Sequence, residues 1–179
     1  MLAISNFFDR ACVYAARFVG LLLFALMLVI AYDIVGRQFF STGSVALQEL
    51  QWHLHGAIAL LGSGYAYTRN AHVRIDILHE SLPTPTKLKL EIFGILFLLT
   101  PFLLVMLWTG FDFALRAFVR GEVSFSDLGL SNRWIIKSVV PFSALFALLG
   151  SWSVALRALL ALRGECPSAY RSEDGLWNS

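Results

Sequence analysis

Residues 48–78 read QELQWHLHGAIALLGSGYAYTRNAHVRIDIL, and the chain is organised around this stretch. It begins as an apolar run at helical spacing, and Ser44 just before it can cap a helix. Glu49 and Trp52 stand in the first turns, where an acid suits the helix dipole and a tryptophan suits a membrane interface. The pattern predicts a helix over residues 45–68 that begins near one membrane surface.

This predicted helix has two different faces. Its large apolar side chains recur at helical spacing and are expected to face lipid; they are Leu50, Leu54, Ile58, Leu61 and Tyr65. Roughly opposite, polar side chains are followed by small ones, which let another backbone approach closely. We expect that second face to contact a partner protein, although packing within this chain alone is the alternative. The candidate residues for the partner interface are Arg37, Glu49, Trp52, His53, Gly56, Ala59, Gly62 and Ser63.

The four histidines are not expected to bind a metal ion or a haem. His53 and His55 are two residues apart, so on a helix they point about 160° away from each other. His72 and His79 follow the predicted helix, so no second spanning helix supplies a histidine for a bis-histidine haem. The sequence therefore predicts neither a cofactor nor a metal site.

The composition is that of an integral membrane protein. Of the 179 residues, 58% are hydrophobic and 15% are charged, and the mean hydropathy is +0.69. Soluble domains carry about 25% charged residues. A net charge of only +2 gives no support for nucleic-acid binding. Cys12 and Cys166 lie near opposite ends and form neither a metal-type pair nor a disulfide framework.

Four apolar segments are long enough to span a membrane as helices, so the predicted fold class is an all-α integral membrane protein. They cover about residues 12–35, 45–68, 88–119 and 133–162. No small-residue cleavage site follows the first run, which indicates an uncleaved helix rather than a signal peptide. The segments predict a four-helix membrane domain over residues 1–163, and a short polar cytoplasmic tail over residues 164–179.

Charged and proline residues add detail to these helices. Asp33 and Arg37 are four apart and can pair on one helical face, or can lie in solvent as an interfacial pair of little energetic weight. Pro101 is expected to kink the third helix or to mark a packing adjustment. Small residues are expected to give the fourth helix a packing face; they are Ser143, Ala147, Gly150 and Ser151.

A polar connector separates the second and third predicted helices. Apolar residues alternate there with Arg74, Asp76 and other polar side chains, and two prolines end the segment. An isolated strand would have no partner, so we expect a short segment that lies in the membrane interface. We expect His72, Arg74 and Asp76 to hold this connector in place.

The basic residues indicate the orientation. With both termini inside, nine lysines and arginines lie on the inner side and five on the outer side. Because positive residues are enriched on the cytoplasmic side, this asymmetry favours N-in and C-in. The connector with His72 then lies in the cytoplasm, and the loop over residues 121–132 lies outside.

The order of these features resembles that of a known family. The matching features are Arg37 after the first helix, Glu49 and Trp52 at the head of the second, the small-residue run Gly56–Gly64, and the loop AHVRIDIL with His72 and Asp76. In this order they resemble the small membrane subunit of tripartite ATP-independent periplasmic (TRAP) transporters, the DctQ-like family. The resemblance covers almost the whole chain.

The resemblance implies a function and partners. It implies a scaffold-like permease subunit in the bacterial inner membrane, beside a large multi-spanning subunit that carries an organic acid together with sodium ions. It also implies a periplasmic substrate-binding protein that docks transiently. The loop over residues 121–132 would then face the periplasm, with Glu122, Phe125 and Asp127 as docking candidates.

Other functions have less support in the sequence. The middle of each predicted helix lacks ionisable residues, which argues against transport by this chain alone. No nucleophile–base constellation or Gly-rich phosphate loop appears, so no enzymatic activity is expected. The alternatives are a haem-bearing membrane anchor of an electron-transfer complex and a stand-alone small transporter.

Overall fold

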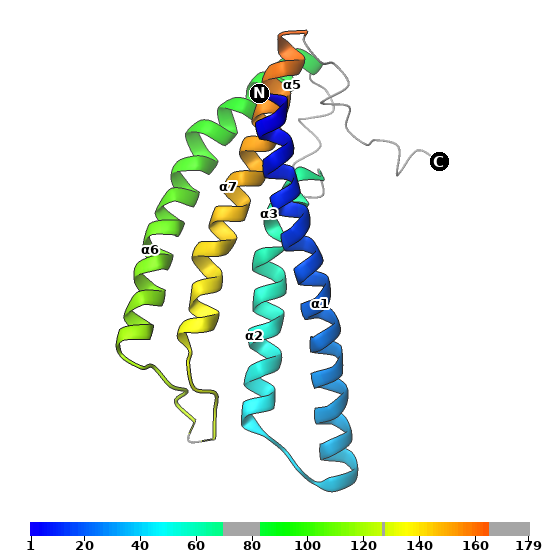
Figure 1. Ribbon diagram of the computed structural model, residues 1–179, viewed down its shortest axis with the longest axis vertical. Coiled ribbons are helices and arrows are strands. Elements are labelled where there is room, and N and C mark those ends of the chain that lie inside the picture. The colour runs from blue at the N-terminus through cyan, green and yellow to red at the C-terminus, as the bar shows by residue number, and fades with distance from the viewer. Residues whose placement is uncertain (70–82, 127, 165–179) are drawn as a thin grey trace.

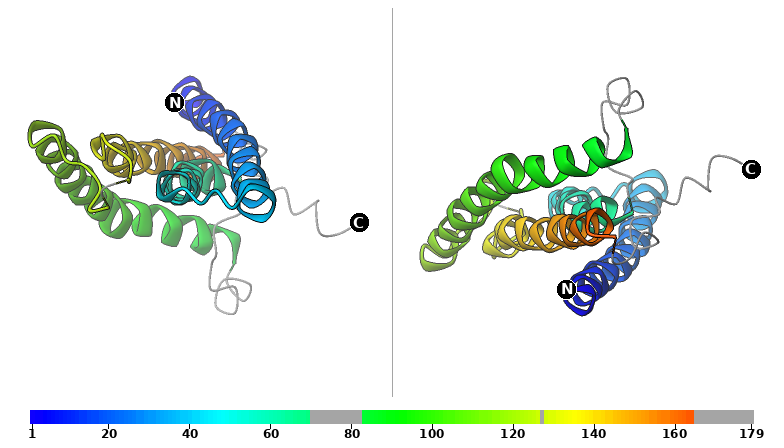
Figure 2. Two further views of the ribbon diagram at one scale, coloured as in Figure 1. Left: turned by 90° about the horizontal axis from the view of Figure 1, so that it is seen from below. Right: turned by 90° about the horizontal axis from the view of Figure 1, so that it is seen from above.

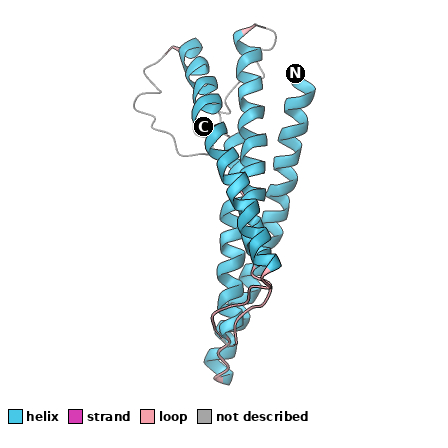
Figure 3. Cartoon of the chain, turned by 90° about the vertical axis from the view of Figure 1, so that its left-hand side faces the viewer, coloured by secondary structure: helices cyan, strands magenta, loops and turns pink. Residues whose placement is uncertain are grey.

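The computed structural model describes residues 1–69, 83–126 and 128–164. Within those ranges every regular element is helical and no strand occurs (Figure 3), which confirms the all-α fold class. The elements are α1 (Leu2–Phe40), α2 (Val45–Leu61), α3 (Ser63–Thr68), α5 (Thr84–Phe93), the π-helix η1 (Gly94–Leu99), α6 (Thr100–Val119) and α7 (Trp134–Leu162).

The helices run side by side in an up-and-down bundle (Figure 1). The start of α1, the start of α5 and the end of α7 lie at one end, which we call the N-terminal end. The end of α1, the start of α2, the end of α6 and the start of α7 lie at the other end, which we call the loop end. Seen along the bundle, α7 and α2–α3 lie between α1 and the helix formed by α5, η1 and α6 (Figure 2).

Helix α7 is the centre of the bundle, since α1, α2, α3, α5 and α6 all pack against it. Its buried residues are mainly small, as the sequence predicted for Ser143, Gly150 and Ser151. Small side chains let several helices approach one axis closely, which is how helices associate where lipid supplies no hydrophobic contrast.

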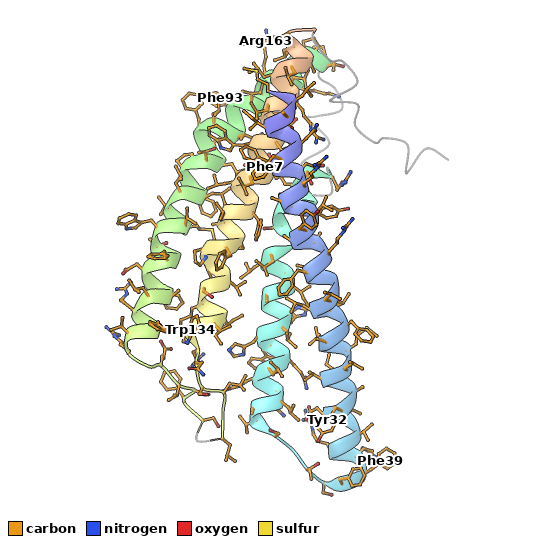
Figure 4. All side chains as sticks on the ribbon, in the orientation of Figure 1. Phe7, Tyr32, Phe39, Phe93, Trp134 and Arg163 are labelled. Carbon is orange, nitrogen blue, oxygen red and sulfur yellow. The ribbon has the colours of Figure 1, made fainter. Side chains whose placement is uncertain are left out.

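Helix α1 is longer than the predicted segment over residues 12–35. It begins at Leu2 because its first turns are bonded to α7, where Ser5 Oγ lies 2.9 Å from Ser153 Oγ. At the loop end, Ser41 adopts a left-handed conformation (φ 52°) and the backbone N–H of Thr42 donates to the Gly36 carbonyl (3.1 Å), which ends the helix. Phe39 of α1 is exposed and projects away from the bundle at this end (Figure 4).

The third long helix starts at Thr84 and contains a widened turn. Proline cannot donate a backbone hydrogen bond and its ring crowds the carbonyl four residues earlier, so Pro101 disturbs the regular hydrogen bonding of the helix. The π-helix η1 just before it relieves this conflict, and the Thr100 hydroxyl donates to the Ile95 carbonyl (2.7 Å). The predicted packing adjustment at Pro101 therefore takes the form of a π-helix.

Among the described residues, three helices are long and apolar enough to cross a membrane by length and composition: α1, the helix over Thr84–Val119, and α7. The predicted helix over residues 45–68 is divided at Gly62 into α2 and α3, so the 17 residues of α2 alone are shorter than a membrane span. The backbone at Gly62 stays right-handed (φ −69°, ψ −20°), and α3 follows α2 toward the N-terminal end (Figure 1).

Candidate partner interface and the anchors that shape it

Asp33 of α1 ties the first two helices together at the loop end. Its side chain is only 1% exposed, and it pairs with the guanidinium of Arg37. The amide Nε2 of Gln51 in α2 donates to the same carboxylate oxygen (3.0 Å). The predicted Asp33–Arg37 pair is thus confirmed, and the alternative that both groups lie in solvent is wrong for Asp33. Arg37, a candidate for the partner interface, keeps much of its side chain exposed.

Glu49 anchors the loop that joins α6 to α7. Its Oε2 accepts the backbone N–H of Leu130 (2.7 Å), and its Oε1 accepts the hydroxyl of Ser124. Ser44 caps the helix that presents this acid, as the sequence predicted, by accepting the N–H of Leu47 (3.4 Å). The interaction partners of Glu49 that the structure describes therefore belong to its own chain, across 75 to 81 residues of sequence.

Gly129 makes this anchor possible. A Cβ atom at that position would lie 2.4 Å from Ser124 Oγ and 2.9 Å from Glu49 Oε1. Only a residue without a side chain lets the loop close over the carboxylate. Sequence reasoning missed both Gly129 and the loop contact of Glu49, because residues so distant in the chain leave no periodic signal.

A second ion pair closes the same loop. Lys137 Nζ lies 2.5 Å from Glu122 Oε2 and 4.0 Å from the centre of the Phe113 ring. The hydrogen bond from the Lys137 ammonium holds the pKa of Glu122 below its usual value, against the opposing effect of burial. A backbone hydrogen bond also closes the loop, because the N–H of Arg133 donates to the Glu122 carbonyl (3.2 Å).

The closed loop presents apolar side chains to its surroundings. Phe125 is 98% exposed, and Val123 and Leu128 are exposed beside it. The guanidinium of Arg133 lies 5.8 Å from the centre of the Phe125 ring. Among the docking candidates, Glu122 supports the loop and Phe125 protrudes from it, whereas Asp127 lies outside the described residues.

The polar and small face of α2 turns outward, and its large apolar face turns toward other helices of the same chain. The large apolar side chains Leu50, Leu54 and Leu61, expected to face lipid, line a groove against α1 and α7 of the same chain. The outward face carries Trp52, which is 80% exposed, together with exposed His55 and Ala59. Apolar residues pack equally well against lipid and against other helices, so hydrophobicity alone does not predict which of the two a face meets.

The remaining candidates on α2 and α3 lie at intermediate positions. A Cβ atom on Gly56 would meet open space, whereas Gly62 and Ser63 are half-buried at the junction of α2 and α3. The ring nitrogen Nδ1 of His53 is bonded to the Glu49 carbonyl within the helix. The connector candidates His72, Arg74 and Asp76 lie outside the described residues.

Gly64 of α3 lies against another helix at very short distance, and the candidate set omitted it. A Cβ atom on Gly64 would lie 2.5 Å from the carbonyl oxygen of Phe146, and one on Gly150 would lie 2.5 Å from the carbonyl oxygen of Gly64. The two backbones thus touch where α3 crosses α7. The small-residue run was the feature of the sequence that indicated close helix packing. It did not reveal which of its glycines contacts α7 of the same chain.

A polar cluster joins α1 to α7 near the N-terminal end. The hydroxyl of Ser153 donates to the Ser5 carbonyl (3.0 Å), and Arg157 Nε donates to Ser5 Oγ (3.0 Å). The guanidinium of Arg157 also lies 3.5 Å from Asp9. Among the described residues, no group of three or more His, Cys, Asp or Glu side chains is arranged to hold a metal ion.

The segment that carries these anchors also matches a protein family. The family of the DctQ component of tripartite ATP-independent periplasmic transporters matches residues 26–162. The matched part runs from the second half of α1 to the end of α7 and includes Asp33, Glu49 and the loop that Glu49 holds. No curated protein shows a significant match to the chain.

Proposed function

The chain belongs to the DctQ family of the tripartite ATP-independent periplasmic transporters, and on that premise we propose that it is the scaffold subunit of such a transporter in the bacterial inner membrane. It binds a large multi-spanning permease subunit through the outward face of α2. Together the two subunits take up an organic acid with sodium ions, delivered by a periplasmic binding protein. The observation that supports this proposal is the residue composition of the outward face of α2.

That face does not suit lipid alone. Trp52 fits a membrane interface, but exposed His55, which lies within the charge-free run 50–68, would be costly if it faced only hydrocarbon. Gly56 and Ala59 on the same side leave room for close approach of another helix. A polar head followed by small residues is the composition expected where a membrane helix meets a protein partner.

Four spans with both termini in the cytoplasm are consistent with the charge distribution. Each segment has a run free of Asp, Glu, Lys and Arg, at residues 18–32, 50–68, 92–111 and 138–156. At 1.5 Å per residue these runs measure about 22 to 30 Å, against a hydrocarbon core of about 30 Å. Because α2 and α3 together supply the second run, the pair forms one span despite the break at Gly62.

Co-purification of the transporter tests the interface. We expect Gly56→Trp and Ala59→Trp to reduce recovery of the large subunit with the tagged small subunit, because a bulky side chain on this face blocks close helix approach. Leu104→Trp, at an exposed position of α6, is the matched control and leaves recovery unchanged. Full recovery with both α2 variants would contradict the proposed interface.

Docking of the binding protein is proposed at the loop between α6 and α7. Its apolar tip is held by Glu49 and Lys137, so Phe125 is offered on an ordered support. In reconstituted transporter, Phe125→Ala is expected to raise the binding-protein concentration that gives half-maximal uptake, with the maximal rate retained. An unchanged concentration dependence would remove Phe125 from the docking surface.

A further inference from the structure

An apolar groove of about 720 Å³ lies between α1, α2 and the first half of α7. Phe18 and Leu22 line it from α1, Leu54 and Leu61 from α2, and Val139 and Phe146 from α7. Contacts of the α2–α3 pair with other parts of the chain lie at both ends of the groove. The Gly64–Gly150 crossing lies toward the N-terminal end, and the Glu49 anchor lies at the loop end.

The length of the groove limits what it holds. Its walls run from Leu50 to Leu61 on α2 and from Ile135 to Phe146 on α7. Eleven residue steps of helix measure about 16 Å, which is close to half of a hydrocarbon core of about 30 Å. A spanning helix of another protein would extend through both halves, whereas the acyl chain of a phospholipid occupies one leaflet.

The groove has its polar groups where a lipid headgroup would lie. His53 and the loop residues Ser131 and Asn132 line it at the loop end. Arg133 follows Asn132 directly and adds a positive charge at this end. On the α7 wall, the Ser138 hydroxyl is engaged within its own helix, since it donates to the Ile135 carbonyl (2.6 Å).

We propose that this groove binds one phospholipid from the leaflet at the loop end. One acyl chain lies between Leu54 and Val139, and the phosphate and glycerol groups lie against His53, Ser131 and Asn132. The acyl chain fills space that the side chains leave empty. It thereby connects the α1–α2 pair to α7 between the Gly64–Gly150 crossing and the Glu49 anchor. This inference rests on the membrane placement in the proposed function, but not on the interface with the large subunit.

Photo-crosslinking locates the lipid. The complete transporter is reconstituted in nanodiscs of phosphatidylethanolamine and phosphatidylglycerol that carry a diazirine in the acyl chain, and the crosslinked peptides are identified by mass spectrometry. We expect crosslinks on groove residues of α2 and α7. Ala57→Phe and Val139→Trp fill the groove and are expected to reduce these crosslinks several-fold, while crosslinks on the exposed face of α6 stay constant.

A second pair of variants leaves the groove volume nearly unchanged. His53→Ala and Asn132→Ala remove headgroup contacts and are expected to lower the number of phospholipids that native mass spectrometry finds retained by the small subunit. Leu104→Trp on α6 is the control for general effects of a bulky residue and keeps both readouts at the wild-type level. Recovery of the large subunit is measured in every variant and is expected to be unchanged in Ala57→Phe, Val139→Trp and Asn132→Ala.

Two results would overturn the lipid site. One is crosslinking in the groove that neither filling variant reduces. The other is loss of the large subunit from the filling variants with lipid retention unchanged, which would assign the groove to a helix of that partner. Failure of the proposed α2 interface would be recognised by a different result. The large subunit would then be fully recovered with Gly56→Trp and Ala59→Trp, which lie on the opposite face of the helix.

Discussion

Gly64 of α3 and Gly150 of α7 touch backbone to backbone, at the point where the two helices cross. A Cβ atom on Gly150 would lie 2.5 Å from the Gly64 carbonyl oxygen and 3.3 Å from the Thr68 side chain. The nearest atom belongs to backbone, so a side chain cannot be accommodated by a change of rotamer. This crossing sets the distance between the α2–α3 pair and the central helix.

Gly150→Ala is therefore expected to destabilise the protein, although alanine is the better helix former. Overpacking of a close contact costs about 1–3 kcal/mol. Gly20→Ala is the matched control, since a Cβ atom on the exposed Gly20 of α1 would meet open space. Thermal unfolding in detergent should show a lower midpoint for Gly150→Ala alone; equal midpoints would mean that the helices do not cross at this distance.

Glu49→Ala is expected to release the loop between α6 and α7. The carboxylate accepts the N–H of Leu130 at 2.7 Å, so its loss removes the acceptor that protects this amide from exchange. Hydrogen–deuterium exchange should accelerate at Leu130 and its neighbours. Gln48→Ala, one residue away on the exposed side, serves as the control, and protection of Leu130 that survives in Glu49→Ala would refute the anchor.

The Glu122–Lys137 pair makes the loop sensitive to acid. Because the Lys137 hydrogen bond lowers the pKa of Glu122 from its ordinary 4.5, the charged acid favours the closed loop. This contribution is complete above that ordinary value and is lost as the pH falls through the lower pKa of the folded protein. Limited proteolysis of the loop should therefore increase in acid for the wild type.

Glu122→Gln is the comparison for that acid titration. It removes the carboxylate and should abolish the acid-dependent step while leaving the cleavage rate raised at neutral pH. A step of unchanged size in Glu122→Gln would assign the acid sensitivity to another group.

Ser5 and Ser153 should be coupled across 148 residues of sequence. Their hydroxyls lie 2.9 Å apart and both are buried between α1 and α7. Hydrogen bonds between membrane helices contribute about 0.6 kcal/mol on average. A double-mutant cycle with Ser5→Ala and Ser153→Ala should give a coupling energy of that size, whereas the cycle with Ser138→Ala, whose hydroxyl donates within its own helix, should give none.

The sequence by itself determined the class of the molecule. Composition and 3.6-residue periodicity indicated an all-α membrane protein, and they placed the Ser44 cap and the adjustment at Pro101. These features depend on residues within a few turns of one another, where backbone geometry and side-chain type act directly. The order of the features along the chain also pointed to the family that matches residues 26–162.

Only the tertiary structure decided how the helices face one another. In the folded chain the large apolar side chains of α2 face inward and Glu49 binds the backbone of Leu130. Gly64, rather than Gly56, lies at the crossing with α7. In a membrane, lipid and protein interior are equally apolar, so the hydrophobic pattern of a helix does not say which face is buried. Small residues and polar contacts between distant segments determine which face is buried, and such contacts form only when the helices pack.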